Sequence, residues 1–206
     1  MIRKSLILPV LGLLLQACAS TGSGRIIAHP SSDWRAAATP QDRERLRNWR
    51  STWLQALAQA RAAGHGAEIA SEGRLLQPDA ALGGAIRNGT YQCRLIKLGA
   101  RSPGGVTFVS YPRFGCEVRQ ERQLQGFAKL SGTQRQVGLI FPGDPLRQVF
   151  LGTLLFSDES RAMQYGWDQE RDVVGFVERI GPGRYRLAMP SPRFDSLFDV
   201  IELSAS

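Results

Sequence analysis

The sequence predicts an α+β protein that is mainly β: an antiparallel meander of eight or nine strands that closes, or nearly closes, into a barrel, with an N-terminal amphipathic helix packed on it. Three observations support this fold class. From Gly89 onward, short segments rich in β-branched, aromatic and leucine residues are separated by Gly, Pro, Ser and Asp. Several connections between them are short enough to be hairpins. One strongly periodic helical segment precedes them.

The N-terminus has the features of a bacterial lipoprotein signal. A basic start is followed by an apolar run from Leu6 to Leu15, and the small residue Ala17 precedes Cys18. The run is too short to span a bilayer, which takes about 20 apolar residues. We therefore expect residues 1–17 to be a signal peptide, and Cys18 to carry a lipid anchor.

Residues 18–33 are expected to be the lipidated cysteine and a flexible tether. The run from Ala19 to Gly24 is small and polar, which is typical of a flexible linker. Ala19 stands where the common sorting rule places an aspartate in lipoproteins retained at the inner membrane. We expect an outer-membrane lipoprotein that faces the periplasm.

The mature chain is moderately basic and has the length of one domain. Loss of Arg3 and Lys4 with the signal lowers the formal net charge from +8 to +6. Lys97 and Lys129 are then the only lysines, so the positive charge is almost entirely arginine. Either an anion-binding face or a general arginine bias explains this composition. The basic residues are dispersed, so we expect no nucleic-acid partner.

A helix is predicted from Thr39 to Ala63 within a helical segment of residues 34–88. Thr39 is a good N-cap, Pro40 suits the first helical position, and Gly64 is a typical helix end. Short helical turns are expected after it. Its apolar stripe predicts a core face, with a sugar-stacking or membrane-contact surface as the alternative, and comprises Leu46, Trp49, Trp53, Leu57 and Ala60.

The barrel is expected to occupy residues 89–206. Alternation supports it: Phe114, Cys116 and Val118 share one face, which predicts one buried and one wet side. An open sheet of this many strands would leave exposed edges, which favours closure. The predicted strands are Tyr91 to Leu98, Val106 to Tyr111, Phe114 to Gln120, Leu124 to Leu130, Arg135 to Phe141, Gln148 to Phe156, Val173 to Ile180, Tyr185 to Met189 and Phe198 to Leu203.

With Cys18 lipidated, Cys93 and Cys116 are the only pair that can form a disulfide. Such a bridge would stabilise the fold by roughly 3 kcal/mol, and two buried free thiols are the alternative. Two cysteines and the distant His29 and His65 offer too few ligands for a metal site, and we expect no cofactor.

The long connection from Ser157 to Asp172 holds the best candidates for a polar or ligand-binding rim loop. They are Tyr165, Trp167, Asp168, Glu170 and Asp172. Paired carboxylates can bind a cation or share a proton, while a solvated loop with local ion pairs is the plainer interpretation. Near another turn, Ser131 to Arg135 suggests an anion-binding nest with Arg135 as the counter-ion, or an ordinary hairpin.

One resemblance to a known family covers nearly the whole mature chain. It is carried by Gly89-Thr90-Tyr91-Gln92-Cys93-Arg94, Phe127-Ala128-Lys129, Val149-Phe150-Leu151-Gly152-Thr153 and Val174 to Gly181. The chain resembles the bacterial lipoprotein family catalogued as domain of unknown function four-eight-nine-three. The resemblance implies a shared fold and compartment and no known reaction. A second resemblance, in architecture alone, is to lipocalin-like barrels, with Tyr91 replacing the tryptophan of their first strand and Arg184 or Arg186 as its partner.

Three functions are compatible with these features. The favoured one is a non-enzymatic binding module that holds a small apolar ligand or docks a partner protein. The second is an accessory protein that contacts anionic envelope polymers through arginines. The third is a hydrolase that uses the loop acids, since no nucleophile motif is present; these acids are Asp158, Glu159, Asp168, Glu170 and Asp172.

Overall fold

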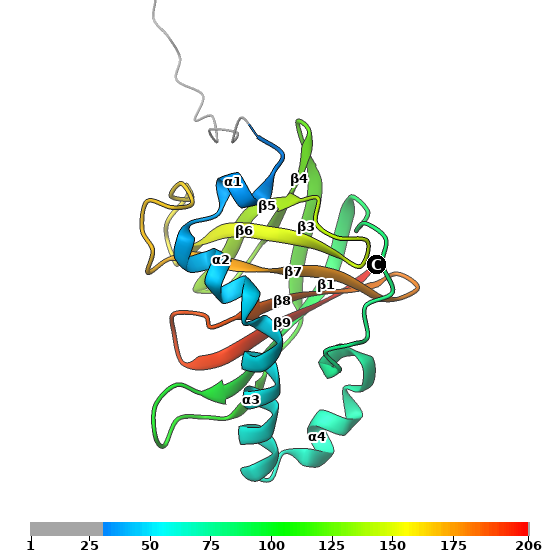
Figure 1. Ribbon diagram of the computed structural model, residues 1–206, viewed down its shortest axis with the longest axis vertical. Coiled ribbons are helices and arrows are strands. Elements are labelled where there is room, and N and C mark those ends of the chain that lie inside the picture. Colours follow the sequence, from blue (N-terminus) through cyan, green and yellow to red (C-terminus); the bar gives the residue numbers. More distant parts are fainter. Residues whose placement is uncertain (1–30, 206) are drawn as a thin grey trace, which may run out of the picture.

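A computed structural model describes residues 31–205 and contains five helical and nine strand segments (Figure 1). The helical segments are α1 (Trp34–Ala37), α2 (Pro40–Arg47), α3 (Trp49–Ala62), α4 (Gly66–Ser71) and the 3-10 helix η1 (Gly73–Leu76). The strands are β1 (Gly89–Ala100), β2 (Phe108–Ser110), β3 (Phe114–Glu121), β4 (Leu124–Lys129), β5 (Gln134–Phe141), β6 (Arg147–Phe156), β7 (Asp172–Gly181), β8 (Arg184–Pro190) and β9 (Ser196–Ala205).

Eight of these strands form a closed antiparallel barrel. Each strand from β3 to β8 pairs with the next one along the chain, and β1 pairs with both β3 and β9. The short β2 pairs only with β1 and lies outside the closed ring. The predicted mainly β fold, its closure and its nine strands are therefore confirmed, and closure leaves no long unpaired edge.

The barrel interior is filled by side chains. Alternate residues of the strands point inward, including Tyr91 and Cys93 on β1, Phe127 on β4 and Phe150 on β6, and all four are buried. The ring of Phe127 meets the edge of Phe150 with centroids 5.7 Å apart. These side chains form a packed core inside the barrel.

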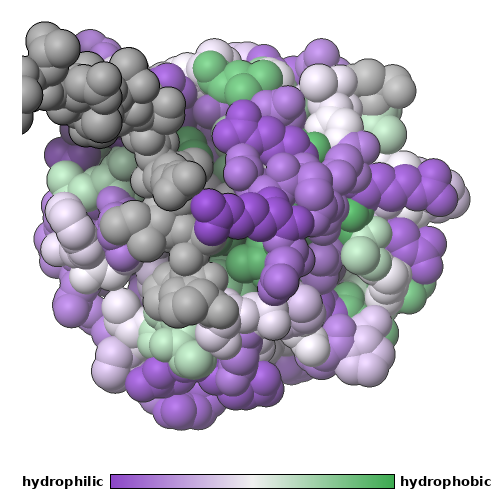
Figure 2. Space-filling model, turned by 90° about the horizontal axis from the view of Figure 1, so that it is seen from above, coloured by the Kyte–Doolittle hydropathy of each residue, from purple (hydrophilic) through white to green (hydrophobic). Residues whose placement is uncertain are grey.

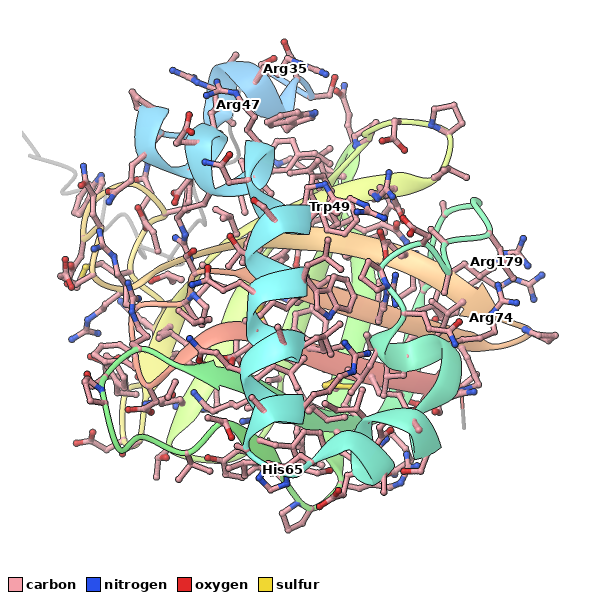
Figure 3. All side chains as sticks on the ribbon, turned by 60° about the horizontal axis from the view of Figure 1, so that its bottom comes forward. Arg35, Arg47, Trp49, His65, Arg74 and Arg179 are labelled. Carbon is pink, nitrogen blue, oxygen red and sulfur yellow. A yellow bond between two sulfur atoms is a disulfide. The ribbon has the colours of Figure 1, made fainter. Side chains whose placement is uncertain are left out.

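A disulfide joins Cys93 and Cys116 inside the barrel, as predicted. It links β1 to β3 with the two α-carbons 6.0 Å apart. Both cysteines are fully buried. The yellow bond in Figure 3 marks this disulfide.

The helices lie on the outer face of the barrel, α2 against β7 and α3 against β1, β8 and β9 (Figure 1). The prediction of one continuous helix from Thr39 to Ala63 is wrong, because the chain breaks at Asn48, whose ψ of 7° is not helical. The Asn48 carbonyl accepts from the N–H of Thr52 and also from the hydroxyls of Ser51 and Thr52. The break lets the two helices follow the curved barrel.

The apolar stripe of these helices is core, as predicted. Trp53 is fully buried and stacks on Phe198 of β9 at 4.5 Å. Trp49, labelled in Figure 3, faces the barrel with its ring edge against Phe176. The sugar-stacking and membrane-contact alternatives for these tryptophans are therefore wrong.

The segment between η1 and β1 closes one end of the barrel. Ile86 is buried in the interior core, its N–H donates to the side chain of Gln148, and its carbonyl accepts from Gln125. Arg179 donates to the carbonyl of Gly83 at 2.6 Å. These contacts attach the segment to the ends of β4, β6 and β7.

The signal peptide of residues 1–17, Cys18 and the tether up to residue 30 lie outside the described residues. The structure begins at Ser31, and Asp33 caps α1 by accepting from the N–H of Arg35.

Candidate functional site

A groove of about 330 Å³ lies on the outer face of the barrel. Its floor is β4, β5 and β6, and its roof is the β6–β7 loop of residues 157–171. A volume of this size lies at the lower end of the range for small-molecule sites. Its apolar side chains are Ala128, Val137, Leu139, Phe141, Leu151, Ala162, Met163, Tyr165 and Trp167.

The floor is hollow because small residues alternate with large ones on neighbouring strands. β4 presents Gly126 and Ala128 outward, whereas β5 presents Val137, Leu139 and Phe141. The short side chains of β4 leave a trough beside the taller wall of β5. An outward-facing apolar row such as this needs a cover, and the β6–β7 loop supplies part of it.

The roof exposes aromatic and apolar surface. Trp167 is 74% exposed and Met163 is 37% exposed, although both border the groove. Large apolar side chains held in water at the rim of an apolar groove are typical of a binding surface.

One anchor of the roof is a buried polar cluster between the loop and α2. The Tyr165 hydroxyl donates to Asp42 at 2.6 Å and accepts from the N–H of Thr39. Arg45 donates to the other oxygen of Asp42 and to the carbonyls of Asp172 and Pro190. This cluster fixes the Tyr165 end of the roof to the helical layer.

Burial shifts the ionisation of two members of this cluster. It raises the pKa of Tyr165, and the hydrogen bond to Asp42 raises it further. Burial also raises the pKa of Asp172 to about 6, partly offset by the N–H of Gly166, which donates to its Oδ1. Oδ2 of Asp172 has no hydrogen-bond partner among residues 31–205.

A second anchor holds the start of the loop. Arg171 donates to both oxygens of Glu159 at 2.7 and 2.9 Å, and its guanidinium lies 4.7 Å from the ring centre of Phe156. Arg135 donates to the carbonyls of Ser157 and Glu159. Both bonds come from Nη2 of Arg135, so its guanidinium lies against the loop backbone, and the anion nest at Ser131 to Arg135 stays a prediction.

The groove has a polar end. Glu117, Arg119 and Glu121 project outward from β3, with Arg119 donating to Glu121. Two acids surround a single guanidinium there, so this end carries a net negative charge.

The predicted rim-loop residues fall into different roles. Tyr165 and Trp167 line the groove, so they come together as a site. Asp168 pairs with Arg171 at 3.4 Å, Glu170 pairs with Arg193 at 3.2 Å, and Asp172 is buried behind Tyr165. The acids do not converge on one cleft.

Sequence reasoning missed the wall of the groove on β5. The signal was present: Val137, Leu139, Ile140 and Phe141 put apolar residues on both faces of one strand. A strand that does not alternate is covered on both sides.

The lipocalin-like arrangement of Tyr91 with an arginine is not found. Tyr91 faces the interior and meets the edge of Tyr185. Arg184 pairs with Glu202 and Arg186 with Glu178 on the outer face.

Between residues 31 and 205, no group of three or more His, Cys, Asp or Glu side chains is placed to hold a metal ion. No helix in that span has the length and apolar composition needed to cross a membrane.

Fold and groove together define a closed eight-stranded β-barrel that carries helices on its outside and an apolar groove beside them. The chain belongs to the family described as Domain of unknown function (DUF4893), which matches residues 34–203 and thus takes in both the helices and the barrel. No curated protein and no solved structure matches the chain.

Proposed function

We propose that this protein is a non-enzymatic binding module that takes a small apolar ligand in the groove beneath the β6–β7 loop. The observation that supports this proposal is the groove itself: about 330 Å³, mostly apolar, with Trp167 at its rim. The buried side chains pack the barrel interior, whereas the outer groove has the size of a small-molecule site.

The groove suits an elongated apolar group better than a compact polar one. Its walls are strand side chains and it runs from the tall apolar face of β5 to the acidic end at Glu117 and Glu121. An apolar chain would bury the exposed surface of Met163 and Trp167, and each buried methylene contributes about 0.8 kcal/mol.

The module is, in this proposal, an outer-membrane lipoprotein facing the periplasm, anchored through Cys18. The supporting features are the signal-like residues 1–17 and the cysteine after Ala17. Incorporation of labelled palmitate into the full chain, compared with Cys18→Ser, tests the anchor. Equal label in both chains would contradict it.

The other two functions have less support. Most arginines of the described chain donate to carboxylates or backbone carbonyls, such as Arg94 to Glu72 and Glu202, which leaves few for an anionic polymer. Seen from above, the described surface shows mixed hydrophilic residues with small hydrophobic patches (Figure 2). A hydrolase would need two loop acids that are free to act in one cleft, whereas Glu159 and Asp168 both pair with Arg171 and Glu170 pairs with Arg193.

The test is native mass spectrometry of the soluble mature chain with Cys18→Ser, purified from the periplasm, followed by titration with dodecanoic acid. Ala128→Phe fills the trough from its floor, and Thr90→Phe places the same ring on an exposed outward position of β1 as a control. We expect a bound mass, or dodecanoic acid binding, in wild type and Thr90→Phe and at least about a tenfold weaker signal in Ala128→Phe.

Two results would contradict the proposal. One is a clean apo mass together with no dodecanoic acid binding, which would favour a partner protein as the occupant. The other is binding that Ala128→Phe leaves unchanged, which would place the ligand elsewhere.

A further inference from the structure

Lys97 and Asp199 form a buried pair on the two strands that close the barrel. They are direct cross-strand partners of β1 and β9, and only 8% and 3% of their surfaces are exposed. Nζ of Lys97 lies 3.5 Å from Oδ2 of Asp199. Both side chains point into the barrel, because Leu95 and Ile201, two positions away on the same strands, belong to the interior core.

The pair borders a small chamber whose surface is more apolar than polar. The volume is about 20 Å³, and Leu154, Val173 and Met189 supply buried apolar side chains. Burial raises the pKa of Asp199, so this carboxyl can take a proton from a neighbouring ammonium. That transfer leaves an amine in contact with a carboxylic acid, and these two groups are the reactants that form an amide.

The two oxygens of Asp199 have different surroundings. Oδ1 accepts from the hydroxyl of Ser196, whereas Oδ2 faces the amine. The bond from Ser196 polarises Oδ1 as a carbonyl oxygen, which leaves Oδ2 as the hydroxyl that can depart. Nζ of Lys97 also lies 3.7 Å from Asp195, but the Asp195 side chain is 76% exposed and solvated. Asp199 is therefore the acid that is held away from water beside the amine.

We propose that Lys97 and Asp199 become joined by an isopeptide bond between Nζ and Cγ, which links the two strands that close the barrel. The ammonium of Lys97 first passes one proton to the carboxylate of Asp199. The neutral nitrogen then attacks Cγ: a C–N bond forms, the bond from Cγ to Oδ2 breaks, and a proton from the nitrogen leaves with the hydroxyl. One water is released, and the step needs no oxidant, reductant or second substrate.

Three features of the site favour this amide. Groups held about 3–3.5 Å apart in a fixed orientation react as if their concentration were about 10⁵–10⁸ M. The chamber has room for the one water that is released. Gln136 borders the chamber at 4% exposure, and its Oε1 has no hydrogen-bond partner among residues 31–205, so the N–H of the new amide has an acceptor within the same chamber.

The test is the intact mass of the soluble mature chain with Cys18→Ser, purified from the periplasm, incubated to constant mass, and then reduced, alkylated and denatured. We expect a chain that is lighter than its sequence by the mass of one water. Trypsin should leave Lys97 uncleaved and give one branched product, in which residues 95–101 are joined to residues 194–206. Fragmentation of this product should place the link on Asp199.

Two alanine variants of this chain form a matched pair, because both acids lie beside the same Nζ. Asp199→Ala should keep the full mass, whereas Asp195→Ala should lose one water. A parent chain of full mass without the branched product would overturn the proposal and leave Lys97 in an ion pair with two acids. A link at Asp195, or a loss of water that persists in Asp199→Ala, would overturn it as well. The branched product is measured in the parent chain, so this result does not depend on whether a variant folds.

Discussion

The carboxyl of Asp172, beneath the roof of the groove, makes the stability of the protein depend on pH. This carboxyl is buried at the start of β7, near Asp42, and the pKa is about 6 in place of the ordinary 3.8. Between these two values the folded chain binds more protons than the unfolded chain. The free energy of unfolding that this group contributes is therefore highest below pH 3.8 and falls as the pH rises through 6.

The substitution Asp172→Asn should remove this dependence. Asparagine keeps the oxygen that accepts from Gly166 and has no charge to bury. We expect the difference in the free energy of unfolding between the variant and wild type to grow, in favour of the variant, by on the order of 2 kcal/mol as the pH rises from about 4 to about 7.5. Urea unfolding at several pH values measures this difference. Asp158→Asn, at an exposed position of the same loop, is the control, and a pH-independent difference for Asp172→Asn would contradict the prediction.

The hydroxyl of Tyr165 should hold the roof of the groove in place more than it stabilises the core. Tyr165→Phe removes the hydroxyl that joins Asp42 to the N–H of Thr39, and a buried bond to a charged group contributes about 1.5–3 kcal/mol. We expect a stability loss in that range and faster hydrogen exchange in residues 157–171. Unchanged exchange in the loop would show that the Arg171 anchor alone holds it.

At the scale of elements, one arginine attaches the helical layer to the barrel. Arg186 of β8 is fully buried and donates to Glu178, to the carbonyls of Arg74, Leu75 and Gln77, and to that of Pro78. Its guanidinium also lies 4.5 Å from the ring centre of Trp53. It therefore organises η1, α3 and β8 at once.

Replacement of Arg186 by Met should cost about 3–5 kcal/mol, because four carbonyls and part of Glu178 lose their donor. Arg147 still pairs with Glu178 at 2.6 Å and limits the loss. The double variant Glu178→Met with Arg186→Met should lose less stability than the two single variants lose in total. Additive losses in a double-mutant cycle would show that the pair does not act as a unit.

The disulfide should be resistant to reduction while the barrel is folded. Both cysteines are fully buried between β1 and β3, so a thiolate cannot reach them without unfolding. We expect dithiothreitol to leave the native chain oxidised. After unfolding and reduction, stability should fall by about 3 kcal/mol, as the loop-closure model gives for a loop of this order. Rapid reduction in native buffer would contradict the burial.

At the scale of the molecule, the features that could be predicted from the sequence are those that depend on residues close together along the chain. Alternation and turn residues located all nine strands, and Thr39 was correctly placed as a cap. The break at Asn48 was missed because Leu46 and Trp49 continue the apolar stripe across it. The groove depends on how residues 157–171 fold back over β5, which is a tertiary contact, so only Tyr165 and Trp167 could be anticipated.

The helices and the barrel should unfold as one unit. Trp53 and Leu57 of α3 share a core with Ile96 of β1 and with Phe198 and Val200 of β9, all nearly fully buried. At Gly99 an added Cβ would lie 2.9 Å from the α-carbon of Ala56, so α3 and β1 are in direct backbone contact. Without the helices, the outer face of the paired strands β1 and β9 would expose a continuous apolar surface.

We therefore expect the urea transitions followed by helical circular dichroism and by tryptophan fluorescence to coincide. A chain that starts at Gly89 should lack a cooperative transition, because β1 and β9 close the barrel beneath α3 and lose its cover. Gly99→Ala in the full chain is the milder test: its positive φ of 66° and the contact with Ala56 should cost several kcal/mol, on the order of 2–4. Separate helix and barrel transitions would mean that the barrel is stable alone and that the helical layer is an accessory to it.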